Sequence, residues 1–188
     1  MNKEIIEALK AQANTRRQFK KALAGNSPTL FQLYEPSKPD GATLRGSISK
    51  LDARLLAENA EGRQVAMVVN CVSGNRRKAD RVTAVNAVFV DDDSGRATSS
   101  TYLALPCPPQ VIVQTSPGRM HVYWLVADCE LTRFRSVQQA LAAQFGTNTS
   151  VCDLARAMRM PGTFNWKSGK PVLSTLVQSG HGAGALYR

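Results

Sequence analysis

The sequence lacks the features that would indicate a membrane protein or a cysteine-based metal site. It has no apolar run of the roughly 18 residues that a membrane-spanning helix needs. Residues 1–25 are charged throughout and lack the apolar centre of a signal peptide. The four cysteines form no CxxC pair, which argues against a zinc site and a disulfide framework; they are Cys71, Cys107, Cys129 and Cys152. We therefore expect a cytoplasmic protein with no membrane partner.

Two further absences narrow the possible enzyme classes. No GxxxxGK[ST] segment occurs, so the phosphate loop of common kinases and NTPases is missing. Only two histidines occur, His121 and His181, which are too few for a relaxase that combines several metal-binding histidines with a tyrosine nucleophile. A carboxylate-dependent nuclease is not excluded by either absence.

The charge balance is strongly positive. The chain has 24 Lys+Arg against 14 Asp+Glu and a pI near 9.9. A basic domain of this size is typical of proteins that bind a polyanion, nucleic acid first among them, although some basic proteins bind none. A hydrophobic fraction of 43% in 188 residues is enough for one domain with a buried core.

Hydrophobic periodicity predicts a mixture of helices and strands. The expected helices cover residues 2–24, 49–60 and 131–146. Thr132 is the expected N-cap of the last helix and Gly146 its C-terminal stop. The expected strands cover residues 29–35, 64–72, 84–93, 110–116, 119–126 and 171–179. Several strands follow one another directly, which favours an α+β fold with a partly antiparallel sheet. We expect one domain over 1–188, with an N-terminal helix in 1–27 and the core in 28–188.

Three adjacent aspartates end the apolar strand AVFVDDD. Because strand residues alternate sides, Asp91 and Asp93 should project to one face and Asp92 to the other. Two carboxylates on one face suit a hard cation such as Mg²⁺ or Mn²⁺. A solvated acidic turn is the alternative.

A second segment, QTSPGRMHVYW, predicts a hairpin. The turn amides and the Ser116 hydroxyl could hold a phosphate, with Arg119 adding positive charge and His121 donating from the following strand. The alternative is an ordinary hairpin in which His121 packs against Trp124.

A third segment, CDLARAMRMPGTFNWKSGK, gathers polar residues around a Pro-Gly turn. Asp153 could be a further metal ligand, and Arg159 and Lys167 could bind phosphates beside Asn165. The alternative is that Asp153 and Arg156 pair locally.

Together the segments AVFVDDD, QTSPGRMHVYW and DLARAMRMPGTFNWK resemble the three motifs of the archaeo-eukaryotic primase superfamily, in particular the RepB-like plasmid and phage primase and primase-polymerase domains. The resemblance covers roughly residues 55 to 172. It implies a catalytic core with an RRM-like, partly antiparallel sheet flanked by helices. Because the chain ends soon after the last motif, we expect that it could be a fragment of a longer replication protein.

The resemblance implies a role for each motif residue. Asp91 and Asp93 would bind two catalytic metals with Asp153 as the third carboxylate, and His121 would contact nucleotide phosphates. Further nucleotide contacts would come from Ser116, Arg119, Arg159, Asn165 and Lys167. The run VDDD leaves open whether Asp92 or Asp93 is the second ligand. Asn148 stands where relatives often carry an extra Asp, so the third ligand depends on Asp153 alone.

The implied activity is primer synthesis, and perhaps extension, on single-stranded DNA from nucleoside triphosphates, with a replicative helicase or accessory helical domain as a further partner. The template contacts would come from basic residues outside the motifs: Arg16, Arg17, Lys20, Lys21, Arg76, Arg77 and Lys78. Two alternatives stay open, a non-catalytic single-stranded nucleic-acid-binding module and a metal-dependent nuclease. The sequence does not decide between a DNA and an RNA product.

Overall fold

The structure, a computed structural model, describes residues 3–38 and 41–180. His181 therefore lies outside the described residues. Across those residues, no helix combines the length and the apolar character needed to cross a membrane.

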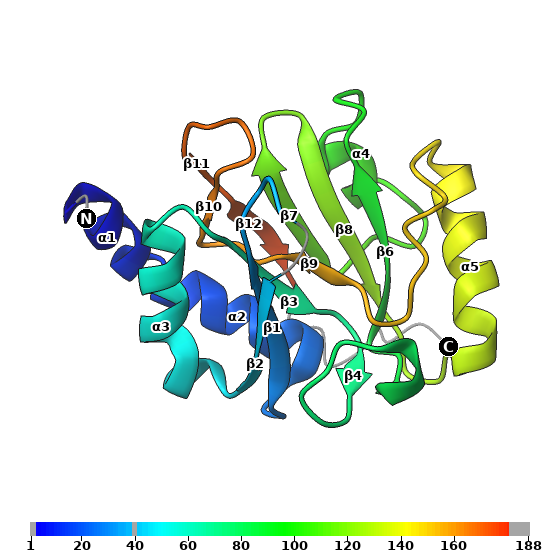
Figure 1. The fold of residues 1–188 in the computed structure, drawn as a ribbon. Helices are drawn as coiled ribbons and strands as arrows, with labels where there is room; N and C mark the ends of the chain where they lie inside the picture. Colours follow the sequence, from blue (N-terminus) through cyan, green and yellow to red (C-terminus); the bar gives the residue numbers. More distant parts are fainter. Residues whose placement is uncertain (1–2, 39–40, 181–188) are drawn as a thin grey trace.

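Two four-stranded antiparallel sheets form the centre of the fold (Figure 1). The strands of the first sheet, in spatial order, are β2 (Gly41–Gly46), β1 (Thr29–Tyr34), β3 (Gln64–Val68) and β9 (Ala157–Arg159). Those of the second are β12 (Thr175–Ser179), β7 (Val111–Ser116), β8 (Arg119–Leu125) and β6 (Ala87–Asp92). Two short pairs complete the strands, β4 (Cys71–Val72) with β5 (Val82–Ala84) and β10 (Phe164–Asn165) with β11 (Val172–Leu173).

Helices flank the sheets on two sides. The helices α1 (Lys3–Ala11), α2 (Ala13–Ala24) and α3 (Ile48–Ala60) pack together beside the first sheet, and α5 (Leu131–Gln144) lies along β6 (Figure 1). The remaining helical segments are short: α4 (Ser99–Leu103) and the 3₁₀ turn η1 (Ala79–Arg81). The predicted α+β fold with antiparallel pairing and flanking helices is confirmed.

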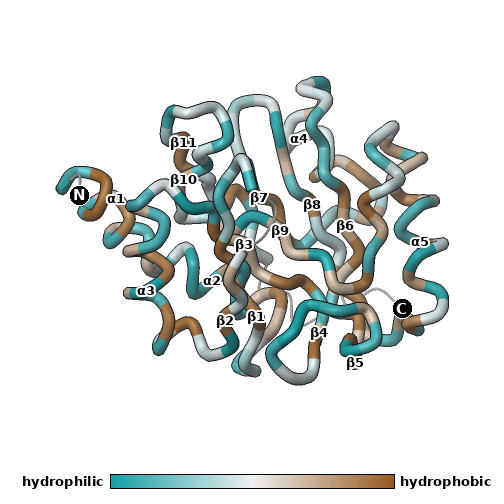
Figure 2. Tube along the Cα trace, viewed as in Figure 1, coloured by the Kyte–Doolittle hydropathy of each residue, from teal (hydrophilic) through white to brown (hydrophobic). Residues whose placement is uncertain are grey.

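One core joins both sheets and α2. Phe31 and Met67 of the first sheet belong to the same buried cluster as Phe89 and Tyr123 of the second. Phe19 of α2 meets Tyr123 edge-on, with ring centroids 5.8 Å apart. Figure 2 shows the hydrophobic colour along the central strands and the hydrophilic colour in many of the connecting loops. Apolar burial of this kind is the main favourable contribution to folding.

A buried glutamine fixes α5 to the edge of the second sheet. The Gln138 Oε1 accepts a hydrogen bond from the Phe89 backbone N–H at 3.1 Å, and its Nε2 donates to the Phe89 carbonyl. Gln138 therefore replaces the missing neighbour strand on the outer edge of β6, where unpaired backbone groups would otherwise be buried.

The structure differs from the sequence predictions at particular residues. The single helix expected over 2–24 is divided at Gln12, and the Leu9 carbonyl at the end of α1 accepts a hydrogen bond from the Arg16 Nη1 at 2.7 Å. The N-cap of α5 is Glu130 rather than Thr132, whereas Gly146 follows the helix with a φ of 62°, as expected. The edge strand β2 and helix α4 were not predicted, because GATLRG is exposed and Gly-rich and α4 spans only 5 residues.

Candidate active site

Asp91 and His121 face each other across the β6–β8 pair. The two residues are direct register partners, and the His121 Nε2 lies 3.4 Å from the Asp91 Oδ1. His121 is almost fully buried, whereas the Asp91 side chain remains 33% exposed, enough to contact a ligand. The predicted strand therefore places the partly exposed Asp91 carboxylate against the buried His121 imidazole.

The environment keeps the Asp91 carboxylate ionised. Burial raises the pKa of Asp91, but the hydrogen bond and positive charge of His121 act against burial. The guanidinium groups of Arg159 and Arg156 act in the same direction as His121, so the pKa of Asp91 lies below its usual value despite its burial. An ionised carboxylate can hold a metal ion, and the neighbouring guanidinium groups can bind phosphates.

A tyrosine supports the other side of the His121 ring. The Tyr123 hydroxyl lies 3.4 Å from the His121 Nδ1. Burial and the charge of Asp91 raise the pKa of Tyr123 well above its usual value, so the hydroxyl stays protonated and can donate to Nδ1. The Nε2 side of the same ring faces the Asp91 carboxylate.

The three aspartates do not share one environment. Asp93 is exposed, and its Oδ2 lies 3.7 Å from the Arg119 Nη1. Asp92 points to the opposite face, where its carboxylate accepts hydrogen bonds from the Tyr102 hydroxyl at 2.8 Å and the Ser94 backbone N–H at 2.9 Å. Asp92 is 2% exposed, so its inclusion among the predicted metal ligands is corrected: its oxygens are buried away from Asp91.

Strand β9 supplies positive charge from the first sheet. The Arg159 Nε donates to the Gln64 Oε1 at 3.2 Å, and the Gln64 Nε2 donates to the Asn165 Oδ1 at 3.1 Å. The Asn165 Nδ2 donates to the Thr115 carbonyl, and the Lys167 backbone N–H donates to the Asn165 Oδ1 at 3.0 Å. Asn165 thus links the two sheets and places Arg159 and Lys167 beside Asp91.

These residues line one pocket of 180 Å³. Its lining comprises Tyr34, Asp91, Asp93, Thr115, Arg119, His121, Arg156, Ala157, Met158, Arg159, Asn165 and Lys167. The structure therefore brings together seven of the predicted site residues from three distant segments. Ser116 does not line the pocket; it pairs with Arg119 in the hairpin, and the neighbouring Thr115 lines the pocket instead.

Asp153 does not join the other two carboxylates. Its Oδ1 lies 2.7 Å from the Arg156 Nε and its Oδ2 lies 3.8 Å from the Arg77 Nη1. Within residues 3–38 and 41–180 no three acidic, histidine or cysteine side chains are grouped closely enough to hold a metal. The predicted three-carboxylate site is corrected accordingly, and the alternative in which Asp153 pairs with Arg156 describes the structure.

The remaining pair, Asp91 and Asp93, still fits a hard cation. Mg²⁺ is commonly held by one or two carboxylates together with substrate phosphates, rather than by a cage made only of protein. Both carboxylates border a pocket that also contains four basic side chains able to bind phosphate, and these are Arg119, Arg156, Arg159 and Lys167.

The basic residues of α2 divide into buried and exposed pairs. The Arg16 guanidinium is 1% exposed, bonds both oxygens of Asp52 at 2.6 and 2.9 Å, and donates to the Gly162 carbonyl. Lys20 is also buried and donates to the Gly25 carbonyl; burial lowers its pKa. The prediction that these two residues contact nucleic acid is corrected, because neither cation is accessible. Arg17 and Lys21 are exposed.

The predicted basic residues after β4 are at the surface. Arg76, Arg77 and Lys78 lie in the 73–78 loop, which reaches toward Asp153 through Arg77. Five residues that line the pocket were not predicted as site residues: Tyr34, Thr115, Arg156, Ala157 and Met158. Tyr34 comes from a strand of the other sheet, and no local pattern indicates it. Arg156 stands in the third motif and was predicted only as a local partner of Asp153.

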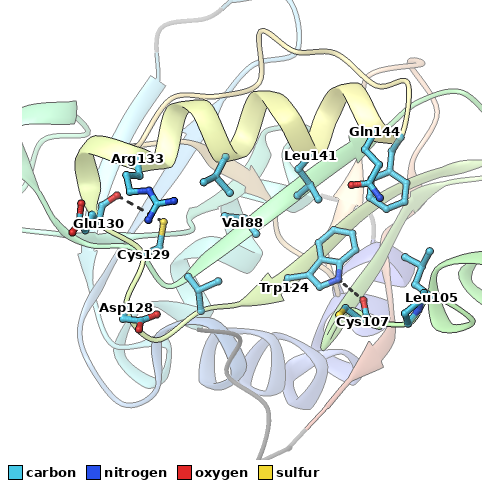
Figure 3. Close-up of a pocket in the computed structure, with 14 residues that line it drawn as sticks. Val88, Leu105, Cys107, Trp124, Asp128, Cys129, Glu130, Arg133, Leu141 and Gln144 are labelled. Atoms are coloured by element: carbon cyan, nitrogen blue, oxygen red, sulfur yellow. Dashed lines mark hydrogen bonds between the residues drawn. The ribbon is translucent and has the colours of Figure 1, made fainter.

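A larger pocket of 760 Å³ lies on the other face of the second sheet, beneath α5 (Figure 3). Val88 and Trp124 are register partners on the face opposite Asp91, and the Trp124 Nε1 donates to the Cys107 carbonyl at 2.8 Å. Leu141 and Phe145 close it from the helix side. Its mainly apolar lining is unsuited to nucleotide phosphates, so it is separate from the candidate active site.

A comparison of the sequence with family profiles shows the family to which the chain belongs. The profile of the RepB DNA-primase N-terminal domain matches residues 45–181. The match covers most of the chain, and the protein belongs to this family. The resemblance drawn from the three motifs is thereby confirmed.

Solved structures share the fold. The AEP domain of the cyanophage S-2L primase-polymerase (PrimPol) is 20% identical with a TM-score of 0.72, over 93% of this chain and 92% of that one. Primase RepB′ is 19% identical with a TM-score of 0.67, over 93% of this chain and 56% of that one. The catalytic domain of RepB′ in complex with initiator DNA is 19% identical with a TM-score of 0.65, over 93% and 85% of the two chains. No protein of curated function matches the sequence.

Proposed function

We propose that this protein is the catalytic domain of a DNA primase, which joins nucleotides on a single-stranded DNA template. The observation that carries the proposal is the pocket that joins two acidic and two basic side chains: Asp91 and Asp93 at the end of β6, and Arg156 and Arg159 at the two ends of β9. Family membership supports the activity, and the RepB′ structure that contains initiator DNA supports a DNA template.

The chain's own residues divide the work of nucleotidyl transfer. Asp91 and Asp93 would hold Mg²⁺ or Mn²⁺, in a two-metal site once the phosphates of the substrate are present. The bound ions would supply Lewis-acid activation of a 3′-hydroxyl and of the α-phosphate. Arg119, Arg156, Arg159 and Lys167 bind the triphosphate, and His121 holds Asp91 in place. Arg76, Lys78, Arg17 and Lys21 are the accessible basic residues proposed to contact the template.

The proposal also includes a partner protein and a cellular compartment. A replicative helicase or an accessory helical domain would deliver the single-stranded template. The site of action would be the cytoplasm, since all four cysteines are free thiols in the structure.

The test is synthesis on a circular single-stranded DNA with labelled deoxy- and ribonucleoside triphosphates, in Mg²⁺ and in Mn²⁺. We expect short labelled products that require both template and metal. A second reaction contains labelled single-stranded DNA and metal without nucleotides. Cleavage there would support a nuclease, and binding with neither synthesis nor cleavage would support a binding module; either result overturns the proposal.

A further inference from the structure

The two oxygens of the Asp153 carboxylate face two different arginines. The Oδ1 lies 2.7 Å from the Arg156 Nε and the Oδ2 lies 3.8 Å from the Arg77 Nη1. The Arg156 backbone N–H also donates to the Asp153 carbonyl at 3.1 Å, which closes a turn between the two residues. The carboxylate is thus engaged by cations on both sides and is not directed at Asp91.

Arg156 extends from this carboxylate to the pocket. Its side chain lines the pocket together with Asp91, and its charge is one of those that act on the Asp91 carboxyl group. The Arg156 carbonyl accepts a hydrogen bond from the Val69 N–H at 3.0 Å, so its backbone is fixed to the end of β3. With the backbone fixed, two contacts orient the long side chain: the close ion pair with Asp153 and a longer hydrogen bond of 3.5 Å from Nη2 to the Ser150 carbonyl. The contact with Asp153 is the shorter of the two.

Arg77 connects the same carboxylate to the 73–78 loop. Its Nη1 donates to the Ala155 carbonyl at 3.3 Å while lying within ion-pair distance of Asp153. The loop that carries the accessible residues Arg76 and Lys78 is therefore held against the segment that carries Arg156. The Asp153 carboxylate therefore contacts both the loop proposed to bind the template and an arginine that lines the proposed nucleotide pocket.

From these contacts we propose that Asp153 is a positioning residue, which directs Arg156 into the nucleotide pocket and tethers the 73–78 loop beside it, and is not a ligand of the metal. The role of Arg156 in nucleotide binding rests on the proposed function. The tethering of the loop does not, because it is argued from the contacts of Arg77 with Asp153 and with the Ala155 carbonyl. The two parts can therefore be tested separately.

The nucleotide part is tested by a double-mutant cycle with Asp153→Asn and Arg156→Gln. Nucleoside triphosphate binding is measured by calorimetry in the presence of Ca²⁺, which avoids turnover. Because the pair is partly exposed, we expect Asp153→Asn to weaken binding about two- to fivefold. In the Arg156→Gln background the same change should have almost no further effect, since residues that act through one another are not additive.

Metal binding separates a positioning role from direct ligation. Mn²⁺ binding without nucleotide is followed by electron paramagnetic resonance for the wild type, Asp91→Asn and Asp153→Asn, each with and without Arg156→Gln. We expect Asp91→Asn to lose Mn²⁺ binding and Asp153→Asn to retain it in the Arg156→Gln background. Loss of Mn²⁺ binding from Asp153→Asn in both backgrounds would make Asp153 a metal ligand and overturn the proposal.

The loop part is tested by limited trypsin digestion, because Arg76, Arg77 and Lys78 are cleavage sites. We expect Asp153→Asn to be cut faster in the loop than the wild type. The matched control is Asp80→Asn, which removes an exposed carboxylate next to the loop that contacts only Arg81 weakly, at 4.0 Å. Equal cleavage rates in Asp153→Asn and the wild type would overturn the tether, even if the protein proved to make no primers.

Discussion

The Tyr102 hydroxyl donates a hydrogen bond of 2.8 Å to the Asp92 carboxylate and so fixes the middle one of three adjacent aspartates inside the protein. Tyr102 is itself 2% exposed and packs against Trp124 and Phe145. Burial, followed by the hydrogen bond to Asp92, raises the pKa of Tyr102 above its usual value. Asp91 and Asp93 on the other face are left to bind ligands.

Tyr102→Phe should therefore lower stability without changing metal binding. The substitution leaves a buried carboxylate without its hydroxyl donor, which costs about 1–3 kcal/mol. Urea unfolding measures the loss, and Mn²⁺ titration of the folded variant is the control. A variant with unchanged stability and weakened Mn²⁺ binding would place Asp92 in the metal site after all.

The lowered pKa of Asp91 predicts a pH-dependent contribution to stability. A carboxyl group whose pKa in the folded state lies below its unfolded value of about 3.9 stabilises the folded protein above that value and loses the effect as pH falls through the folded pKa. The wild type should therefore lose stability relative to Asp91→Asn as pH falls below about 4. Denaturant unfolding of both proteins between acidic and neutral pH measures this difference. A difference that grows toward acid would contradict the assigned direction.

Arg16 and Arg17 are adjacent in sequence and should respond in opposite ways to substitution. Arg16→Ala removes the partner of Asp52 and two donors to backbone carbonyls, and breaking a buried pair of this kind costs about 3–5 kcal/mol. Arg17→Ala changes an exposed side chain and should alter stability by less than about 0.5 kcal/mol. Chemical denaturation of the two variants tests this contrast, and similar stabilities would contradict it.

The 73–78 loop should contribute to the salt dependence of DNA binding. If Arg76 and Lys78 each contact one phosphate of a single strand, replacing both by Gln reduces the slope of log affinity against log salt by about 1.4. Fluorescence anisotropy with a labelled oligonucleotide at several salt concentrations gives the slope. The matched control is Lys3→Gln with Lys38→Gln, two exposed lysines outside the proposed contacts. An unchanged slope in the loop variant would remove the loop from the template site.

Short-range sequence patterns correctly predicted most of the strands. They also predicted which of the three adjacent aspartates share one face of the sheet. The period-2 alternation of AVFVDDD correctly separates Asp92 from Asp91 and Asp93. The predicted hairpin pairs His121 with Val113, whereas the position of His121 opposite Asp91 comes from the pairing of β6 with β8, which local patterns did not predict. The pairing of β9 with β3 joins segments far apart in the chain, so the alternation within either strand could not show which arginine reaches Asp91. The same limit applies to Tyr34, which reaches the pocket from a separate sheet.

Helical spacing indicates that Arg16 and Lys20 lie on the buried face of α2. Both residues share a face of α2 with the buried residues Phe19 and Leu23, at intervals of three, four and seven positions. What the sequence could not show is the partner, because Asp52 and the Gly162 carbonyl come from distant segments.

The central claim is that Asp91 and its pocket carry out nucleotidyl transfer, and the adjacent aspartates allow a direct test. Primer synthesis on single-stranded DNA is measured at saturating Mn²⁺ for the wild type, Asp91→Asn and Asp92→Asn, with folding checked by circular dichroism. We expect Asp91→Asn to lose synthesis on the order of 100-fold or more, because Asp91 would hold the metal ions that activate the reacting groups, and Asp92→Asn to remain active. Equal synthesis by Asp91→Asn and the wild type would contradict the account.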